Sequence, residues 1–125
     1  MPKTILIVED FEDSRILLKY LLEKLGYEVL EAEDGFKAME IAKRHIPDLI
    51  FMDMALPLIN GLSATKIIRQ FKETSKIPII AITASGEYIY PQAIEAGCND
   101  LILKPLDIDK LQPMIERYLP QEVNS

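Results

Sequence analysis

Polar side chains that could do chemistry follow several short apolar runs of this 125-residue chain. They are the carboxylates of Glu9, Asp10 and Asp53, the hydroxyl of Thr83 and the ammonium of Lys104. Three carboxylates brought together repel one another and demand a cation. All-oxygen ligation in a site open to water suits Mg²⁺, which keeps several waters and bridges to phosphate. The three acids therefore predict a magnesium site, provided that the fold gathers them.

The other two side chains suit a phosphoryl group. Lys104 supplies a point charge that can pair with Asp53 or with a phosphoryl oxygen, and the Thr83 hydroxyl can donate to that oxygen. A carboxylate can attack phosphorus and form an aspartyl phosphate, a transfer that depends chiefly on alignment and charge neutralisation. The alternative is a surface ion-pair cluster around Lys104, but such a cluster does not need a third acid.

Strand-like and helix-like segments alternate along the chain. The predicted strands are residues 4–8, 27–32, 49–52, 79–82 and 101–103. The second contains Glu28 and Glu31, which favours an edge position. The predicted helices are about 13–25, 35–44 with Asp34 as cap, 62–71, a segment ending near 97, and about 108–118. Five strand–helix units in this order predict a doubly wound α/β fold, a parallel sheet with helices on both faces.

This fold explains how the polar residues could meet. In open parallel sheets, ligands bind outside the carboxyl ends of the strands. The first, third, fourth and fifth strands are each followed by one or two of the five polar residues. One polar residue after a strand would mean little, whereas four strands with complementary chemistry predict a shared site.

Two prolines resist the simple helical pattern. Pro91 cannot lie deep inside a helix, so we expect the fourth helix to begin near it, with Pro91 in the first turn. Pro113 removes one backbone donor and is expected to kink or delay the last helix.

Length, charge and cysteine content set limits on the function. The length predicts one domain over residues 1–125, with an ordered core over about 3–119 and a short polar tail. The net charge of -6 and the lack of a Lys/Arg stripe disfavour direct binding to nucleic acid. No apolar run approaches the roughly 20 residues that span a bilayer. Cys98, the single cysteine, fits a reducing compartment, so we expect a cytoplasmic protein.

At the polar strand ends the sequence resembles the response-regulator receiver domains of two-component signalling, including single-domain chemotaxis-type regulators. The resemblance runs from Ile5 to about Leu119. It rests on four motifs: Val8-Glu9-Asp10, Asp53-Met54-Ala55-Leu56-Pro57 with Gly61, Thr83-Ala84 and Lys104-Pro105. It implies a flavodoxin-like sheet with strand order 2-1-3-4-5 and a phosphoacceptor switch, not an enzyme, that assists only its own phosphorylation and dephosphorylation.

The resemblance implies a role for each site residue. Asp53 would accept a phosphoryl group from the phosphohistidine of a sensor histidine kinase or a phosphotransfer protein. Glu9, Asp10, Asp53 and the backbone carbonyl of Ala55 would bind Mg²⁺, with Glu9 in place of the more frequent aspartate. Thr83 and Lys104 would contact the phosphoryl group.

The resemblance also covers the loops around these residues. Pro105 would follow Lys104 through a cis peptide bond. Gly61 and Pro57 would shape the loop after Asp53.

The sequence departs from the family pattern at one position that is linked to signal output. Many receivers carry an aromatic residue, whose rotation reports phosphorylation, at the position of Leu101. Either the signal is read out differently or weakly, or Leu101 merely packs while the nearby helix moves, and both readings stay open. The resemblance places the target-binding face on the fourth helix, fifth strand and fifth helix, a region flanked by Tyr88 and Tyr90.

Three other functions share parts of this pattern. A flavin carrier needs a phosphate cradle of small and hydroxyl residues where this chain has Glu9-Asp10. A phosphatase with an aspartate nucleophile usually places a second acid where this chain has Ala55. A degenerate receiver that binds proteins without phosphorylation has no reason to keep three mutually repelling acids.

Overall fold

The computed structural model describes residues 2–56, 58–84 and 86–120, without the side chains of 86–88. Pro57 and the Tyr88 side chain, both named above, therefore lie outside the described residues. Along the described chain, strands and helices alternate as follows: β1 (Thr4–Val8), α1 (Glu12–Lys24), β2 (Glu28–Ala32), α2 (Gly35–His45), β3 (Leu49–Asp53), α3 (Gly61–Gln70), β4 (Ile79–Thr83), α4 (Gly86–Ala96), β5 (Asp100–Leu103) and α5 (Ile108–Tyr118). This order is the predicted one.

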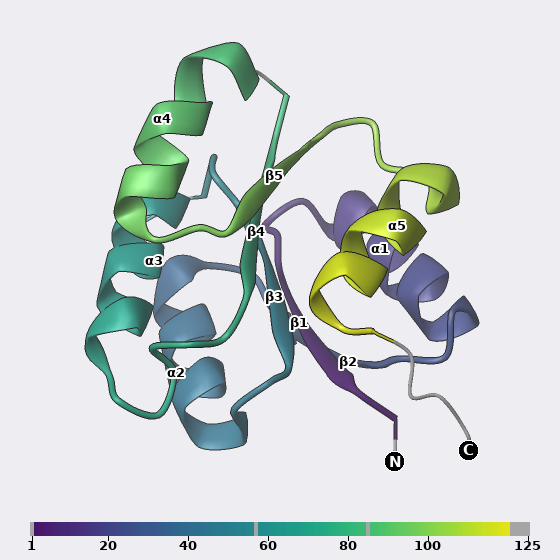
Figure 1. Ribbon diagram of the computed structural model, residues 1–125, viewed down its shortest axis with the longest axis horizontal. Coiled ribbons are helices and arrows are strands. Elements are labelled where there is room, and N and C mark those ends of the chain that lie inside the picture. The colour runs from purple at the N-terminus through teal and green to yellow at the C-terminus, as the bar shows by residue number, and fades with distance from the viewer. Residues whose placement is uncertain (1, 57, 85, 121–125) are drawn as a thin grey trace.

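The strands form one parallel sheet in the order β2-β1-β3-β4-β5, which confirms the predicted fold and the edge position of β2. Helices α1 and α5 cover one face, and α2, α3 and α4 cover the other (Figure 1). The register pairs Val8 with Met52, Asp53 with Ile82 and Thr83 with Leu103. The carboxyl ends of the four strands that carry the site are therefore level with one another.

Each face of the sheet has its own apolar core. Alternate residues of β1 point to opposite faces, with Leu6 and Val8 in the core under α2, α3 and α4, and Ile5 and Ile7 in the core under α1 and α5. All four are fully buried. Each such side chain stabilises the fold by roughly 1.5–3 kcal/mol, so the sheet is a rigid base for the residues at its edge.

Side-chain caps fix the beginnings of three helices. The carboxylates of Asp34 and Asp107 accept hydrogen bonds from the N–H groups of Lys37 and Lys110, at 2.8 and 3.0 Å. Asn60 caps α3 in the same way by accepting from Ser63 N–H at 2.9 Å. A cap of this kind is worth about 1 kcal/mol, and the Asp34 cap was predicted from the sequence.

The expected start of the fourth helix near Pro91 and the expected delay of the last helix by Pro113 are both wrong. Helix α4 begins at Gly86, so Pro91 lies in its middle and not in its first turn. Ile89, two residues earlier, is partly buried against the core, and this packing stabilises the helix by more than the loss of one backbone hydrogen bond at Pro91 destabilises it. Pro113 does not delay α5, because the Asp107 cap starts the helix at Ile108 and Leu111 and Ile115 are buried. A kink at Pro113 stays a prediction.

None of the helices in the described part of the chain combines the length and the apolar composition of a membrane-spanning segment.

Candidate functional site

The acids predicted from the sequence come together at the carboxyl edge of the sheet. Glu9 and Asp10 follow β1, and Asp53 ends β3. Each offers a carboxylate oxygen, and these oxygens lie within 4.8 Å of one another. Glu9 and Asp53 are buried, whereas Asp10 is exposed and its carboxylate has no hydrogen bond to any described residue. This set of oxygens, open to water on one side, fits a hard cation such as Mg²⁺.

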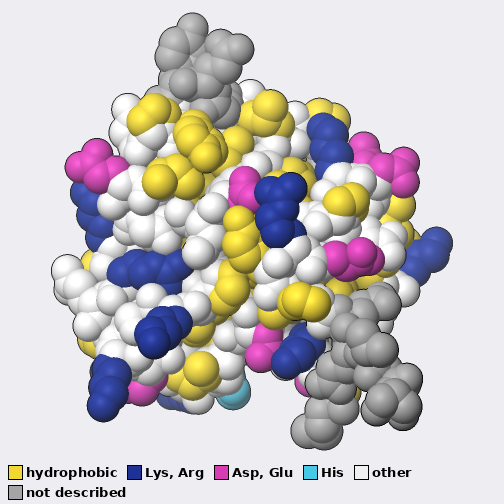
Figure 2. All heavy atoms as spheres, viewed as in Figure 1, with side chains coloured by type: hydrophobic (Ala, Val, Ile, Leu, Met, Phe, Trp, Pro, Cys, Tyr) yellow, Lys and Arg dark blue, Asp and Glu magenta, His cyan; other side chains and the backbone are white. Residues whose placement is uncertain are grey.

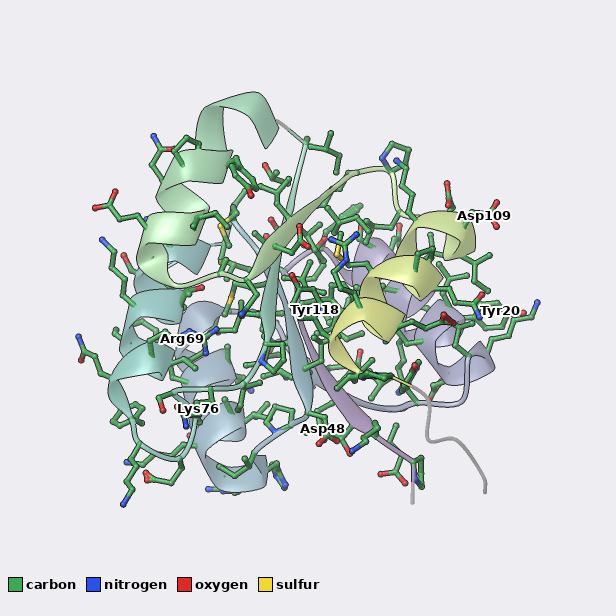
Figure 3. The ribbon with its side chains drawn as sticks, in the orientation of Figure 1. Tyr20, Asp48, Arg69, Lys76, Asp109 and Tyr118 are labelled. Carbon is green, nitrogen blue, oxygen red and sulfur yellow. The ribbon has the colours of Figure 1, made fainter. Side chains whose placement is uncertain are left out.

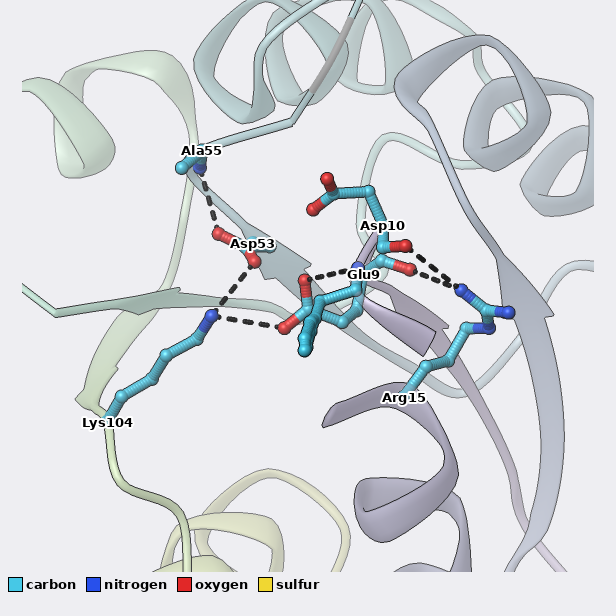
Figure 4. Close-up of polar contacts among 7 residues, drawn as sticks. Glu9, Asp10, Arg15, Asp53, Ala55 and Lys104 are labelled. Carbon is cyan, nitrogen blue, oxygen red and sulfur yellow. Dashed lines mark hydrogen bonds and ion pairs between the residues drawn. The ribbon is translucent and has the colours of Figure 1, made fainter. Parts of the chain in front are cut away.

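Lys104, the residue directly after β5, completes the group. Its ammonium nitrogen lies 3.0 Å from Oε1 of Glu9 and 3.1 Å from Oδ2 of Asp53 (Figure 4). Burial by itself would lower the pKa of Lys104, but the hydrogen bonds to Glu9 and Asp53 outweigh it and raise the pKa. The side chain therefore stays charged and offsets part of the repulsion between the acids.

The site changes the protonation of Glu9. Burial raises the pKa of Glu9 to about 7, with Asp53 adding to the rise and Lys104 opposing it. The metal-free site therefore tends to hold a proton on Glu9 near neutral pH. A bound cation would take the place of that proton.

Asp53 is held in one orientation. Its Oδ1 accepts a hydrogen bond from Ala55 N–H at 2.8 Å, while Oδ2 accepts from Lys104. The N–H of Met54 donates to Ile82 O at 3.0 Å and ties the following loop to β4. The buried carboxylate thus faces the other acids. Ligation by the Ala55 carbonyl stays a prediction.

Gly61, the first residue of α3, lies directly against this loop. A Cβ atom at this position would collide with the backbone carbonyl oxygen of Asp53 and lie 2.9 Å from Cα of Met54. Glycine therefore allows α3 to begin beside Asp53, in agreement with the role that the resemblance implies for it.

The remaining predicted residues lie on β4, β5 and the segment after β5. Thr83 ends β4 at the same edge, and its carbonyl accepts from Lys104 N–H at 2.9 Å, whereas the role of its hydroxyl stays a prediction. The Lys104–Pro105 peptide bond is cis. Leu101 is partly buried and packs against the core under α4. The effect of Leu101 on output stays open.

One site residue was missed by the sequence reasoning. The Nη1 of Arg15, on α1, donates to the carbonyl oxygens of Glu9 at 3.0 Å and Asp10 at 3.5 Å. Its Nε lies 3.3 Å from Oε1 of Glu31 on β2. The sequence signal that could have pointed to this residue is a basic side chain five residues after Asp10, about one turn into the following helix.

A groove of about 380 Å³ beside the site was also missed. Glu9 and Lys104 line it together with Leu17 and Leu21 of α1 and with Pro105. Tyr20, further along α1, is 59% exposed and points away from the molecule (Figure 3). The site thus opens next to an apolar surface.

Comparisons with known proteins agree with this geometry. The family model of the response regulator receiver domain matches residues 5–116. The chain is 38% identical to the polar-differentiation response regulator DivK of Brucella anthropi over 120 residues, 95% of this chain and 98% of DivK.

Two solved structures are similar over nearly the whole chain. The receiver domain of a sensor histidine kinase of Pseudomonas aeruginosa, with a magnesium ion coordinated in its active site cleft, is 34% identical with a TM-score of 0.91, covering 97% of this chain and 100% of that one. The receiver domain of Saccharomyces cerevisiae Ssk1, crystallised with the histidine phosphotransfer signalling protein Ypd1, is 31% identical with a TM-score of 0.86, covering 94% and 88%.

Proposed function

This chain belongs to the response regulator receiver domains, and from that premise we propose that it accepts a phosphoryl group on Asp53 in a magnesium-dependent reaction. Receiver domains are signalling switches that interact with histidine kinases or phosphotransfer proteins, and the donor proposed here is the phosphohistidine of such a partner. The observation that supports the proposal most directly is the contact of Lys104 with both Asp53 and Glu9, beside the open carboxylate of Asp10.

The proposed transfer assigns a task to each residue. Glu9, Asp10, Asp53 and the Ala55 carbonyl would hold Mg²⁺, which would supply positive charge to neutralise the phosphoryl oxygens. Ala55 N–H fixes the Asp53 carboxylate, which would form the new P–O bond as the P–N bond breaks and its electron pair returns to the imidazole nitrogen.

The two remaining side chains would act on the transferred group. The Lys104 ammonium and the Thr83 hydroxyl would each hold a phosphoryl oxygen. Lys104 already points at Asp53, so it needs little movement to bind the product.

The groove beside the site supports a protein as donor. Asp53 is 2% exposed, so a phosphohistidine must come close to the edge of the sheet to reach its carboxylate. Glu9 and Lys104 line both the groove and the site, and Phe11 and Leu17 are half exposed nearby. We propose that a histidine-bearing donor protein covers this apolar surface during transfer, as Ypd1 and Ssk1 form a complex.

The proposed output surface is the face of α4, β5 and α5. On this face apolar side chains gather over α4 and along β5, while Lys and Arg side chains are dispersed (Figure 2). Tyr90, Ile94 and Leu103 are exposed large hydrophobic residues of α4 and β5. A target protein would bind here when phosphorylation of Asp53 changes the position of α4.

The proposal also covers domain organisation, cellular location and binding to nucleic acid or membrane. We propose that residues 1–125 act as a single receiver domain in the cytoplasm, without direct binding to nucleic acid or membrane. The net charge of -6 and the buried thiol of Cys98 support this setting.

Phosphoramidate, a small donor with a P–N bond, tests the transfer. With Mg²⁺ we expect ³¹P NMR to show one new acyl phosphate resonance, and no resonance without Mg²⁺. Turnover of p-nitrophenyl phosphate without a stable phosphoprotein would favour the phosphatase alternative.

Beryllofluoride with Mg²⁺ tests the output surface by mimicking the phosphoryl group. We expect amide shifts on α4, β5 and α5, and tighter binding of a candidate target. Target binding that ignores beryllofluoride would favour a degenerate receiver, a protein-binding module independent of phosphorylation.

A further inference from the structure

Arg15 holds the main chain of both acids that follow β1. It donates from Nη1 to the carbonyls of Glu9 and Asp10, and its Nε pairs with Glu31. Its side chain is only 16% exposed. In Figure 4 its guanidinium points at the backbone of the two acids from the side opposite Lys104. Arg15 therefore touches the support of the site and not its carboxylates.

The acid segment has few other tethers. The last sheet-like bond is the one from Glu9 N–H to Ala32 O at 3.0 Å. Phe11 O then accepts from Arg15 N–H at 3.0 Å as α1 begins. Between these bonds, Phe11 N–H donates to Oε2 of Glu9 at 3.4 Å, and Arg15 is the described side chain that binds the carbonyls of both acids. It thus restrains the peptide groups from which the two carboxylates project.

We propose that Arg15 is a positioning residue that sets the affinity of the site for Mg²⁺ by fixing the backbone of Glu9 and Asp10. The inference rests on the proposed function, because it concerns the same site. Mg²⁺ demands near-ideal octahedral geometry, so carboxylates held in place bind it better than mobile ones. Residues that orient metal ligands typically change metal affinity by about 10–100-fold when they are replaced.

The positive charge of Arg15 would affect the affinity for Mg²⁺ in the opposite direction to its positioning role. A guanidinium near the site repels a cation, so its removal would tighten Mg²⁺ binding if charge alone mattered. Lys19 offers a matched control. It lies on α1 like Arg15, its ammonium lies 3.3 Å from the same Glu31, and among the described residues it has no hydrogen bond or ion pair with Glu9 or Asp10. The direction of the change in affinity therefore separates positioning from charge.

The experiment compares the full chain with Arg15→Gln, Arg15→Lys and Lys19→Gln. Calorimetry gives the Kd for Mg²⁺, and hydrogen exchange of the Asp10 and Phe11 amides in metal-free protein reports the mobility of the segment. For Arg15→Gln we expect a Kd about tenfold higher and faster exchange of these amides. Arg15→Lys keeps the charge but cannot span both carbonyls and Glu31, so its Kd should also rise. Lys19→Gln should leave both measurements unchanged.

An Arg15→Gln protein that binds Mg²⁺ as tightly as wild type, or more tightly, overturns the inference. If that variant does not fold, Arg15→Lys decides, because an unchanged Kd there overturns the inference and a raised Kd supports it. Failure of the wild-type chain to bind Mg²⁺ would instead contradict the proposed function itself. The two failures are therefore distinguishable.

Discussion

The ammonium nitrogen of Lys104 lies 3.1 Å from Oδ2 of Asp53, although 51 residues separate the two in the chain. The sheet brings them together, because β4 lies between β3 and β5 and pairs with both in parallel. The bond from Lys104 N–H to Thr83 O then fixes where the lysine leaves the sheet. The contact is a consequence of strand order and register.

Replacing Lys104 should expose the repulsion between the acids. Lys104→Met leaves Glu9 and Asp53 without their cation, and we expect the metal-free protein to lose about 1 to 2 kcal/mol of unfolding free energy. The loss is smaller than for a fully buried pair because 34% of the Lys104 side chain is exposed. Mg²⁺ should restore more stability to this variant than to wild type, as measured by urea unfolding.

Lys110→Met is the control for that experiment. Lys110 bonds to the carbonyl of Pro105 on the exposed side of α5 and not to the acids. Equal responses of the two variants to Mg²⁺ would refute the role given to Lys104.

Magnesium binding should depend on pH through Glu9. The pKa of Glu9 is raised to about 7, mainly by burial, and the ion requires the carboxylate form. The affinity for Mg²⁺ should therefore rise about tenfold from about pH 6 to about pH 8, with release of a proton. Calorimetry in buffers of different ionisation enthalpy measures both quantities. A Kd that stays constant over this range would argue against the assignment of Glu9.

The unfolding free energy of the metal-free protein should also depend on the protonation of Glu9, but it should fall as pH rises. The folded pKa of Glu9 is about 7 against an ordinary value of 4.5, so between these values the folded protein holds a proton that the unfolded chain releases. The contribution of Glu9 to the unfolding free energy should fall by on the order of 2 kcal/mol as pH rises through this window. Glu9→Gln should remove this slope, whereas Glu12→Gln, at an exposed acid of α1, should keep it. Identical slopes in the two variants would contradict the assignment.

Gly61→Ala should disturb the site through the backbone. The added Cβ would collide with the Asp53 carbonyl, and we expect a loss of about 2 to 3 kcal/mol together with weaker Mg²⁺ binding. Gly26→Ala is the control, because Gly26 has a positive φ of 99° but open space around it. It should cost about 1 kcal/mol and leave Mg²⁺ binding intact. If both variants bind Mg²⁺ like wild type, the close approach of α3 does not matter for the site.

The sequence allowed the fold and the carboxylates to be predicted for a physical reason. Apolar runs that end in polar residues are local signals, and a parallel sheet turns such strand ends into neighbours, as for Asp53 and Lys104. Arg15 gave no comparable signal, because its partners are backbone carbonyls, which every residue carries. The groove depends on how α1 packs beside Pro105. The start of α4 was mispredicted at Pro91 because Ile89 packs against the core, a contact that only the tertiary structure shows.

The identity of the phosphorylated residue is tested most directly by intact-mass measurement after incubation with acetyl phosphate and Mg²⁺. Asp48→Asn is the matched control, because Asp48 binds Thr4 N–H at the opposite edge of the sheet (Figure 3). Wild type and Asp48→Asn should each gain the mass of one phosphoryl group, and Asp53→Asn should gain none. A wild-type protein that gains no mass, or an Asp53→Asn protein that gains as much as wild type, would contradict the account.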